Sequence, residues 1–426
     1  MAFGTLVISM IYIFLLKWIT KPLLYVSMVL ILVFFILLGG WSWIQRSKYD
    51  PITEEKNYQY ATAGAAVSWT FAAIYLCFMC CCWSKIALGA SIMECASVFV
   101  SQNLRVVLLP ILMYVFVAIF FVYWITTAVY LYSIGEPEFD AGSPVANIIW
   151  DDKTWGMMWY FLFGLFWCIA YMICLQQFII AAMCCMWYFS GQGSEMSDQP
   201  GEVGMLKAMS WGMYYHLGSI AFGSFLIALI TMIRVVFEYL VKQYEAVGNK
   251  ENPVYKAAKC CIRCVLWCLD KYVKFITKNA YIQIALHNSN FCKAAWESFF
   301  LIIRHAGRFG SAAIIGWIMM MLGKGTIVAS SAYLTILIVE RGFPMVQQPF
   351  IPAIIVAAIA YVVGSLFLSI FSFSCTAILH CFLMDEDTGG SANTPDSLRS
   401  FLDYNDEANA KATASKKEAE DDKKEE

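Results

Sequence analysis

Residues 214–239 read YYHLGSIAFGSFLIALITMIRVVFEY and combine a membrane-length apolar run with two tyrosines, a histidine and an oppositely charged pair. Such groups are costly in lipid, so a helix that carries them is expected to lie inside a bundle. Arg234 and Glu238 stand one helical turn apart, and this spacing predicts a structural ion pair. Small residues at one flank should let another helix come close: Gly218, Ser219, Ala221, Gly223 and Ser224.

Composition places most of the chain in the membrane. Apolar residues make up 60% and charged residues 14% of its 426 residues, and mean hydropathy is +0.64, whereas about a quarter of a soluble protein is charged. We expect an all-α, polytopic transmembrane helical bundle of about eight spans with additional amphipathic or re-entrant helices. The spans are runs near or above the roughly 20 residues that a bilayer requires, preceded by a shorter run at 2–16: 22–44, 60–83, 104–132, 157–190, 210–241, 311–340 and 352–384.

The charges predict part of the topology. Run 2–16 lacks a basic leader and a small-residue cleavage site, so it predicts one arm of a helical hairpin that turns at residues 17–22, not a signal peptide. Lysines in that turn favour the cytosol, which places the acidic loop 133–156 outside, either as a cation-gathering mouth or as a solvated loop. The basic stretch 242–278 also favours the cytosol, whereas counting spans from the acidic loop places this stretch outside. Segment 210–241 or 279–309 is then re-entrant or amphipathic.

The composition changes abruptly after Met384. Residues 385–426 contain thirteen acidic and six basic side chains. Such a segment cannot bury enough apolar surface to fold by itself. We expect a transmembrane domain over 1–384 and a charged, disordered cytosolic tail over 385–426. The positive charge that this leaves on the body is typical of loops beside anionic lipid and not of nucleic-acid binding.

Several short blocks follow one another along the chain, and together they resemble the choline transporter-like family of membrane proteins over nearly all of the sequence before the tail. Members of this family usually begin with a further membrane helix and a long, cysteine-containing extracellular loop, whereas this chain starts at what resembles their second helix. The blocks are Gln176-Gln177, Trp187-Tyr188-Phe189, Tyr215-His216-x-Gly218-Ser219-x-Ala221-Phe222-Gly223, Arg234-Val235-Val236-x-Glu238-Tyr239, Cys260-Cys261 to Cys268, Asn279-Ala280-Tyr281-Ile282, Asn290-Phe291-Cys292 and Cys381-Phe382-Leu383.

The resemblance implies transport of choline or a related organic cation such as ethanolamine, down its gradient or in exchange for protons. We expect residence in the plasma membrane, with an organelle as the alternative. Choline's quaternary head has no N–H to donate, so aromatic faces must hold it, at about 0.5–2 kcal/mol per contact. His216 could carry the proton or form a structural hydrogen bond. The expected binding residues share segments with polar groups: Trp211, Tyr214, Tyr215 and His216 on one helix, and Tyr171, Gln176 and Gln177 on another.

Sixteen cysteines raise the question of metal or disulfide chemistry. None lies in 45–59 or 133–156, the two loops expected outside, which gives no support to an extracellular disulfide framework. A zinc site is disfavoured because Cys260 and Cys261 point to different faces of a helix and no second pair of ligands follows nearby. We expect no metal and no cofactor. Apolar packing or reversible palmitoylation is the interpretation for Cys260, Cys261, Cys264 and Cys268.

Motifs of soluble enzymes are absent: the chain has no Walker A, G-x-G-x-x-G, H-E-x-x-H or G-x-S-x-G sequence. We therefore predict that it is not an enzyme. The alternative to transport is a multipass scaffold that packs against other membrane proteins and docks through its charged tail. A transporter should have a midplane pocket lined by the residues named above, whereas a scaffold should be sealed.

Overall fold

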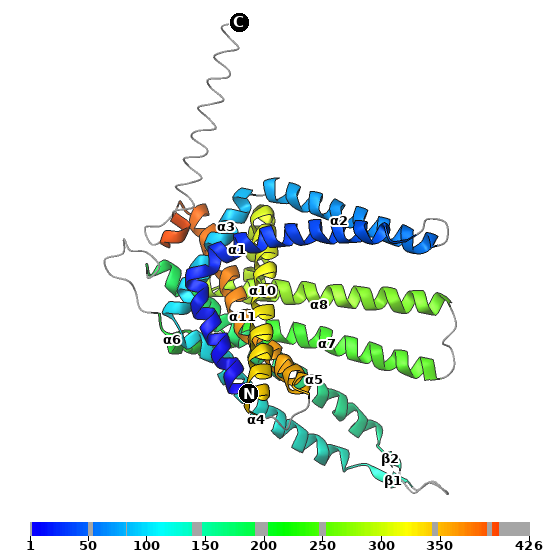
Figure 1. Ribbon diagram of the computed structural model, residues 1–426. Helices are drawn as coiled ribbons and strands as arrows, with labels where there is room; N and C mark the ends of the chain where they lie inside the picture. Colours follow the sequence, from blue (N-terminus) through cyan, green and yellow to red (C-terminus); the bar gives the residue numbers. More distant parts are fainter. Residues whose placement is uncertain are drawn as a thin grey trace. The chain divides into compact units, whose positions relative to one another are not determined.

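The computed structural model describes residues 2–49, 54–81, 83–138, 147–191, 203–246, 253–342, 348–389 and 394–399. Nearly all of them are helical, and they form two compact units (Figure 1). The predicted all-α, multipass architecture is confirmed, and the chain is an integral membrane protein. In this part of the chain, seven helices are long and apolar enough to cross a membrane: Pro22–Arg46, Glu55–Cys81, Arg105–Tyr132, Asp152–Phe189, Leu217–Ala246, Ala306–Gly342 and Phe350–Asp387.

The first unit is formed by five helices from the two ends of the chain. Its α10 packs along α11 and also contacts α1 and α3. A Cβ at Gly323 of α10 would lie 2.9 Å from Leu368 of α11, so the glycine allows a close approach there. The helices are α1 (Ala2–Arg46), α2 (Glu55–Cys81), α3 (Trp83–Gln102), α10 (Ala306–Gly342) and α11 (Phe350–Asp387).

The amino-terminal segment differs from its prediction. Instead of a hairpin that turns at residues 17–22, the backbone is helical from Ala2 to Arg46 with Pro22 inside. Figure 1 shows that α1 bends without reversing. Proline lacks the amide hydrogen and crowds the preceding turn, which is the common cause of a helix bend. The hairpin prediction is therefore wrong, because one bent helix replaces two short ones.

The predicted domain boundary at residue 385 falls inside α11, which continues to Asp387. Beyond it, residues 394–399 are described, and Leu398 is fully buried. The hydroxyl of Thr394 donates a hydrogen bond to the Asp385 carboxylate at 2.9 Å. The first part of the charged tail therefore packs on α11, whereas residues 400–426, where most of the predicted tail lies, are outside the described residues.

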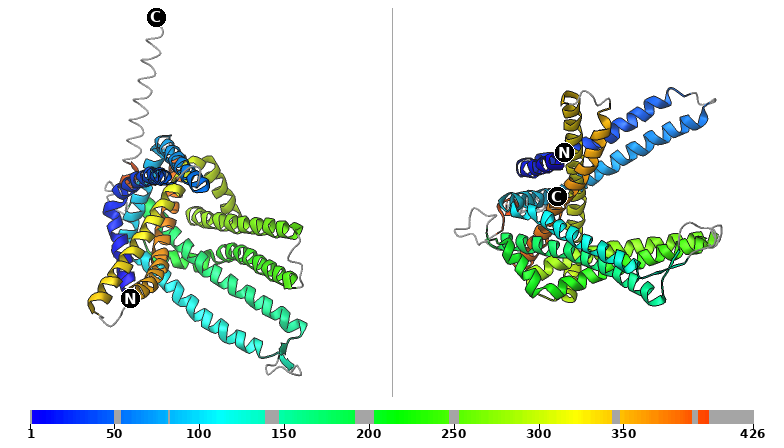
Figure 2. Two further views of the ribbon diagram at one scale, coloured as in Figure 1. Left: turned by 45° about the vertical axis from the view of Figure 1, so that its right-hand side comes forward. Right: turned by 90° about the horizontal axis from the view of Figure 1, so that it is seen from below.

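The second unit is built around α5, whose carboxyl-terminal half is deeply buried. Helix α5 packs against α4, α7 and α8. Figures 1 and 2 show α7 and α8 running side by side in every view. The elements are α4 (Arg105–Tyr132), β1 (Glu136–Glu138), β2 (Asn147–Ile149), α5 (Asp152–Phe189), α6 (Met205–Ser210), the π-helix η1 (Trp211–Tyr215), α7 (Leu217–Ala246), α8 (Pro253–His287) and α9 (Phe291–Arg304).

The segment 279–309, predicted as one amphipathic piece, is divided among the end of α8, the whole of α9 and the start of α10. Helix α8 continues to His287, and Asn288 then has φ of 51°, a conformation that asparagine tolerates better than most residues. Helix α9 follows and buries one face at helical spacing through Phe291, Ala294, Ser298 and Leu301. The amphipathic character that the sequence predicts therefore belongs to α9, while residues 279–284 of α8 are buried.

Candidate functional site

Helix α7 begins at a π-helical turn, which breaks the predicted span 210–241 near its start. The His216 amide donates to the Trp211 carbonyl at 3.0 Å, so one extra residue is accommodated in the turn. A Cβ at Gly212 would lie 2.9 Å from Leu175 and 3.1 Å from Phe178 of α5. A side chain at this position would require Leu175 to shift, so the glycine helps this turn to lie close to α5. Such π-turns are frequent at functional sites because they redirect side chains.

The predicted aromatic residues on this turn point in different directions. Trp211 and His216 are half-buried, whereas Tyr214 and Tyr215 are 83% and 77% exposed. The structure therefore does not bring the four side chains into one cage. The Lys207 ammonium lies 5.4 Å from the centre of the Trp211 ring, which shows that this ring can receive a cation on its face.

His216 is half-buried and packs against α5. Its ring centre lies 5.3 Å from that of Phe178. It lies one residue before the candidate span, and burial lowers the pKa of its imidazole. The neutral ring is therefore favoured near pH 7.

The predicted residues on α5, Tyr171, Gln176 and Gln177, are all half-buried. Close to Tyr171 is a polar contact that sequence reasoning missed. The Tyr281 hydroxyl of α8 donates to the Ile220 carbonyl of α7 at 3.1 Å and also contacts the Cys174 thiol of α5. The sequence signal that could have revealed this contact was Tyr281 itself, a polar aromatic residue in the apolar end of α8, two positions after Asn279.

The second half of α7 carries charges that pair across to α8. Arg234 Nη1 lies 3.4 Å from Asp270 Oδ2, and Arg263 donates two hydrogen bonds to the Glu238 carboxylate at 2.7 and 2.5 Å. Lys259 Nζ lies 2.7 Å from Glu245 Oε1. The predicted pairing of Arg234 with Glu238 is therefore wrong. Each side chain reaches the antiparallel neighbour, because α8 presents the opposite charge at the same level.

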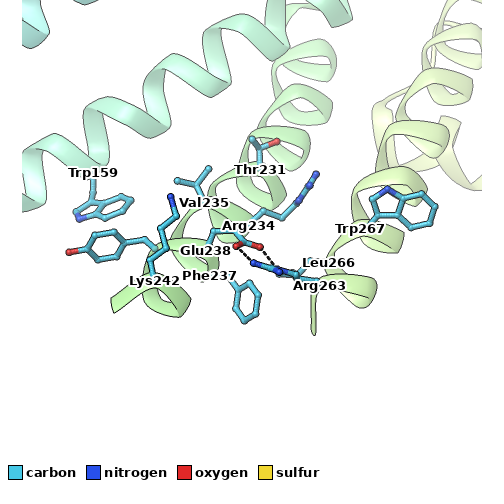
Figure 3. A pocket seen from close by; sticks show the side chains of 11 residues that line it. Trp159, Thr231, Arg234, Val235, Phe237, Glu238, Lys242, Arg263, Leu266 and Trp267 are labelled. Atoms are coloured by element: carbon cyan, nitrogen blue, oxygen red, sulfur yellow. Dashed lines mark hydrogen bonds and ion pairs between the residues drawn. The ribbon is translucent and has the colours of Figure 1, made fainter. Parts of the chain in front are cut away.

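A groove with a volume of about 760 Å³ lies beside these pairs, between α5, α7 and α8 (Figure 3). Its walls are mostly apolar and aromatic, and the Trp159 and Tyr239 rings meet edge to face with centres 5.4 Å apart. Three basic side chains but a single carboxylate line it: Arg234, Lys242, Arg263 and Glu238. The aromatic walls would suit an organic cation, but the excess positive charge opposes one.

The acidic loop forms a β-hairpin that leads into α5. Strands β1 and β2 are antiparallel, with Glu136 opposite Ile149. Asp151 caps α5 by accepting a hydrogen bond from the Thr154 amide at 3.0 Å, and hydrogen bonds from the Thr154 side chain and amide hold the pKa of the Asp151 carboxyl below its usual range. Asp151 therefore has a structural role, and the gathering of cations at this loop stays a prediction.

The four clustered cysteines lie on α8 and are all exposed. The face of α8 that pairs with α7 carries other residues, among them Arg263 and Asp270. Among the described residues, no group of three or more His, Cys, Asp or Glu side chains could hold a metal ion. Exposure leaves Cys260, Cys261, Cys264 and Cys268 accessible for the predicted palmitoylation.

Comparison with known proteins gives consistent matches. A sequence profile of the family described as "Plasma-membrane choline transporter" matches residues 66–387. Choline transporter-like protein 1 of Xenopus laevis is 28% identical over 407 residues, covering 89% of this chain and 59% of the relative. Choline transporter-like 2 of Anopheles gambiae is 32% identical over 238 residues, covering 54% and 29%, and choline transporter-like protein 4 of Homo sapiens is 26% identical over 359, covering 73% and 50%. The chain spans about half the length of the curated relatives it matches.

Proposed function

Because the chain belongs to the plasma-membrane choline transporter family, we propose that it moves choline or a related organic cation such as ethanolamine across the plasma membrane. The observation that carries this proposal is the match itself, which extends from within α2 to the end of α11. Seven helices of membrane-spanning length support it. The proposed activity is transport without chemical change of the cation, and choline is its proposed small-molecule partner.

We place cation binding at the junction of α5 and η1, on Trp211 and the half-buried α5 residues Tyr171, Gln176 and Gln177. The Lys207 ammonium near the Trp211 ring stands where a substrate cation would meet the same face. An aromatic face attracts a quaternary ammonium without any donor hydrogen, and amide oxygens add acceptors near the charge. Tyr214 and Tyr215 are exposed, so their proposed part is to complete the site when substrate enters. This junction is preferred over the groove beside Arg263, where the net charge is positive.

Transport is either facilitative or in exchange for protons. Whether His216 carries a proton distinguishes the two mechanisms. Burial lowers the pKa of His216, so protonation requires a pH below the usual histidine range near 6.5. If His216 carries the exchanged proton, a more acidic compartment on one side should accelerate exchange. If His216 only packs against Phe178, transport should not respond to a pH gradient.

The test is uptake of labelled choline into proteoliposomes that contain the purified full chain, with and without an opposing pH gradient. Trp211→Ala should raise the KM for choline about tenfold, the equivalent of one lost cation–π contact of about 1.4 kcal/mol. Lys207→Met should lower the KM, because it removes a competing cation. Tyr160→Ala is the matched control, since Tyr160 is a 79% exposed aromatic residue on α5.

The outcomes separate the hypotheses. Loss of gradient stimulation in His216→Gln, with uptake retained, would assign the proton to His216. Equal KM values in Trp211→Ala and Tyr160→Ala would remove the α5–η1 junction from the binding site. No uptake by a folded chain would favour the scaffold alternative, in which the protein binds other membrane proteins.

A further inference from the structure

The groove beside the α7–α8 ion pairs carries a positive charge that its own carboxylates do not cancel. Arg263 is neutralised by Glu238. Arg234 shares Asp270 with Lys274, so two cations meet one carboxylate there. Lys242 is exposed and lies one turn from Glu238, which it influences electrostatically, but the hydrogen bonds of that carboxylate go to Arg263. The groove and its immediate neighbours therefore hold two more basic than acidic groups.

The walls of the groove suit an apolar chain. Val235 and Leu266 line it together with the aromatic rings of Trp159 and Trp267, and Trp267 is 54% exposed. In Figure 3, Lys242 extends toward the Trp159 side of the groove and Arg234 toward the Trp267 side. Arg234 and Arg263 are already paired with carboxylates, so a ligand that fits combines apolar length with a negative charge at the Lys242 end.

Position along α7 defines the ligand further. Lys242 lies one turn before the end of α7 at Ala246, on a helix of membrane-spanning length. Tryptophans and tyrosines gather where a helix meets the headgroup layer, and basic residues there attract anionic lipid. Trp159 and Tyr239 lie next to Lys242 in this groove.

We propose that the groove between α5, α7 and α8 binds one anionic glycerophospholipid. Its phosphate lies near Lys242, and an acyl chain lies along Val235, Leu266 and Trp267. This site is separate from the proposed choline site, and its occupant has the opposite charge. Binding of the lipid and transport of choline can therefore be measured independently.

The experiment is a lipid titration of the full chain in detergent, followed by native mass spectrometry. Phosphatidylglycerol is the anionic probe, and phosphatidylcholine is the zwitterionic comparison. Lys242→Gln should weaken binding of the tightest phosphatidylglycerol about fivefold, as expected for one basic residue near a lipid surface. Lys242→Arg should keep the wild-type affinity. Lys153→Gln is the matched control, because Lys153 is an exposed lysine at the start of α5 in the same unit.

Two further arms test position and ligand class. Val235→Trp should fill the groove and abolish the tightest binding event, and circular dichroism and thermal melting of each variant report on its fold. Inorganic phosphate at the lipid concentration should not displace phosphatidylglycerol, because a free anion lacks the chain. Equal weakening by Lys242→Gln and Lys153→Gln, equal affinity for the two lipids, or unchanged binding in folded Val235→Trp would overturn the proposal.

Discussion

Asp270 is the most buried charged group between α7 and α8, with 5% of the residue exposed. Two cations contact it: Arg234 Nη1 lies 3.4 Å from Oδ2, and Lys274 Nζ lies 2.8 Å from Oδ1. Because each cation can compensate for loss of the other, we expect strongly non-additive effects. Arg234→Gln or Lys274→Gln alone should cost about 0.5–1 kcal/mol of unfolding free energy, since both cations are half-exposed.

The double variant should behave differently. It leaves the Asp270 carboxylate buried without an ion-pair partner, which costs about 3 kcal/mol in comparable cases. The coupling between the two substitutions is then about 1–2 kcal/mol, well above the roughly 0.3–0.5 kcal/mol by which independent sites deviate from additivity. In an Asp270→Asn background, the same substitutions should become nearly neutral, because no buried charge needs a partner.

The assay is unfolding in mixed micelles with increasing sodium dodecyl sulfate, followed by circular dichroism, for all members of the cycle. Choline uptake is measured in parallel to separate stability from activity. Additive single and double effects would refute shared neutralisation of Asp270. The same costs in the Asn background would show that Arg234 and Lys274 act through packing instead of charge.

Three further predictions concern local features. Gly223→Ala should destabilise the chain in the same unfolding assay, because its Cβ would lie 2.7 Å from the Phe291 ring, whereas Gly218→Ala, with nothing within 4 Å, should be tolerated; equal unfolding midpoints would contradict this packing. The lowered pKa of Asp151 means that its cap contributes above the ordinary aspartate pKa of about 3.9 and is lost as the pH falls through the lower folded value. After correction for the intrinsic exchange rate, amide protection at the start of α5 should decrease as the pH falls, and Asp151→Asn should remove that change in protection; wild-type protection that does not change with pH would exclude the cap. Acyl-exchange labelling should fall when serine replaces the exposed thiols, and undiminished labelling would exclude palmitoylation at Cys260, Cys261, Cys264 and Cys268.

The long helices could be predicted from the sequence because a bilayer demands about 20 apolar residues in a row, and few other structures supply them. Their boundaries were less accurate where helix continued through a break in composition, as at Pro22 in α1. The burial of Gly223 against α8 and α9 agrees with the predicted close approach of a helix, although Gly218 in the same stripe is exposed. Small residues permit a contact, but the partner decides which of them it uses.

Site geometry was harder to predict, because it depends on neighbours that are distant in sequence. Spacing of four residues suggests that Arg234 pairs with Glu238, yet their partners on α8 lie 36 and 25 positions away. The orientation of Tyr215 depends on the π-turn, because one extra residue in a turn rotates the side chains before it relative to those after it. Neither a pair across helices nor a π-turn has a reliable local pattern.

The cross-helix pairs bear on the conflict over residues 242–278. The rule that basic residues mark the cytosolic side applies to charges near the ends of spans. Lys259, Arg263 and Lys274 are each paired with a carboxylate within the α7–α8 pair. Figures 1 and 2 show the end of α7 on the same side of the second unit as the β1–β2 hairpin. Lys259 and Arg263 meet acidic groups of α7, whereas Lys274 meets Asp270 of α8 itself. This pairing accounts for part of the basic composition of α8, and the low hydropathy of α8 does not by itself place the whole helix in water.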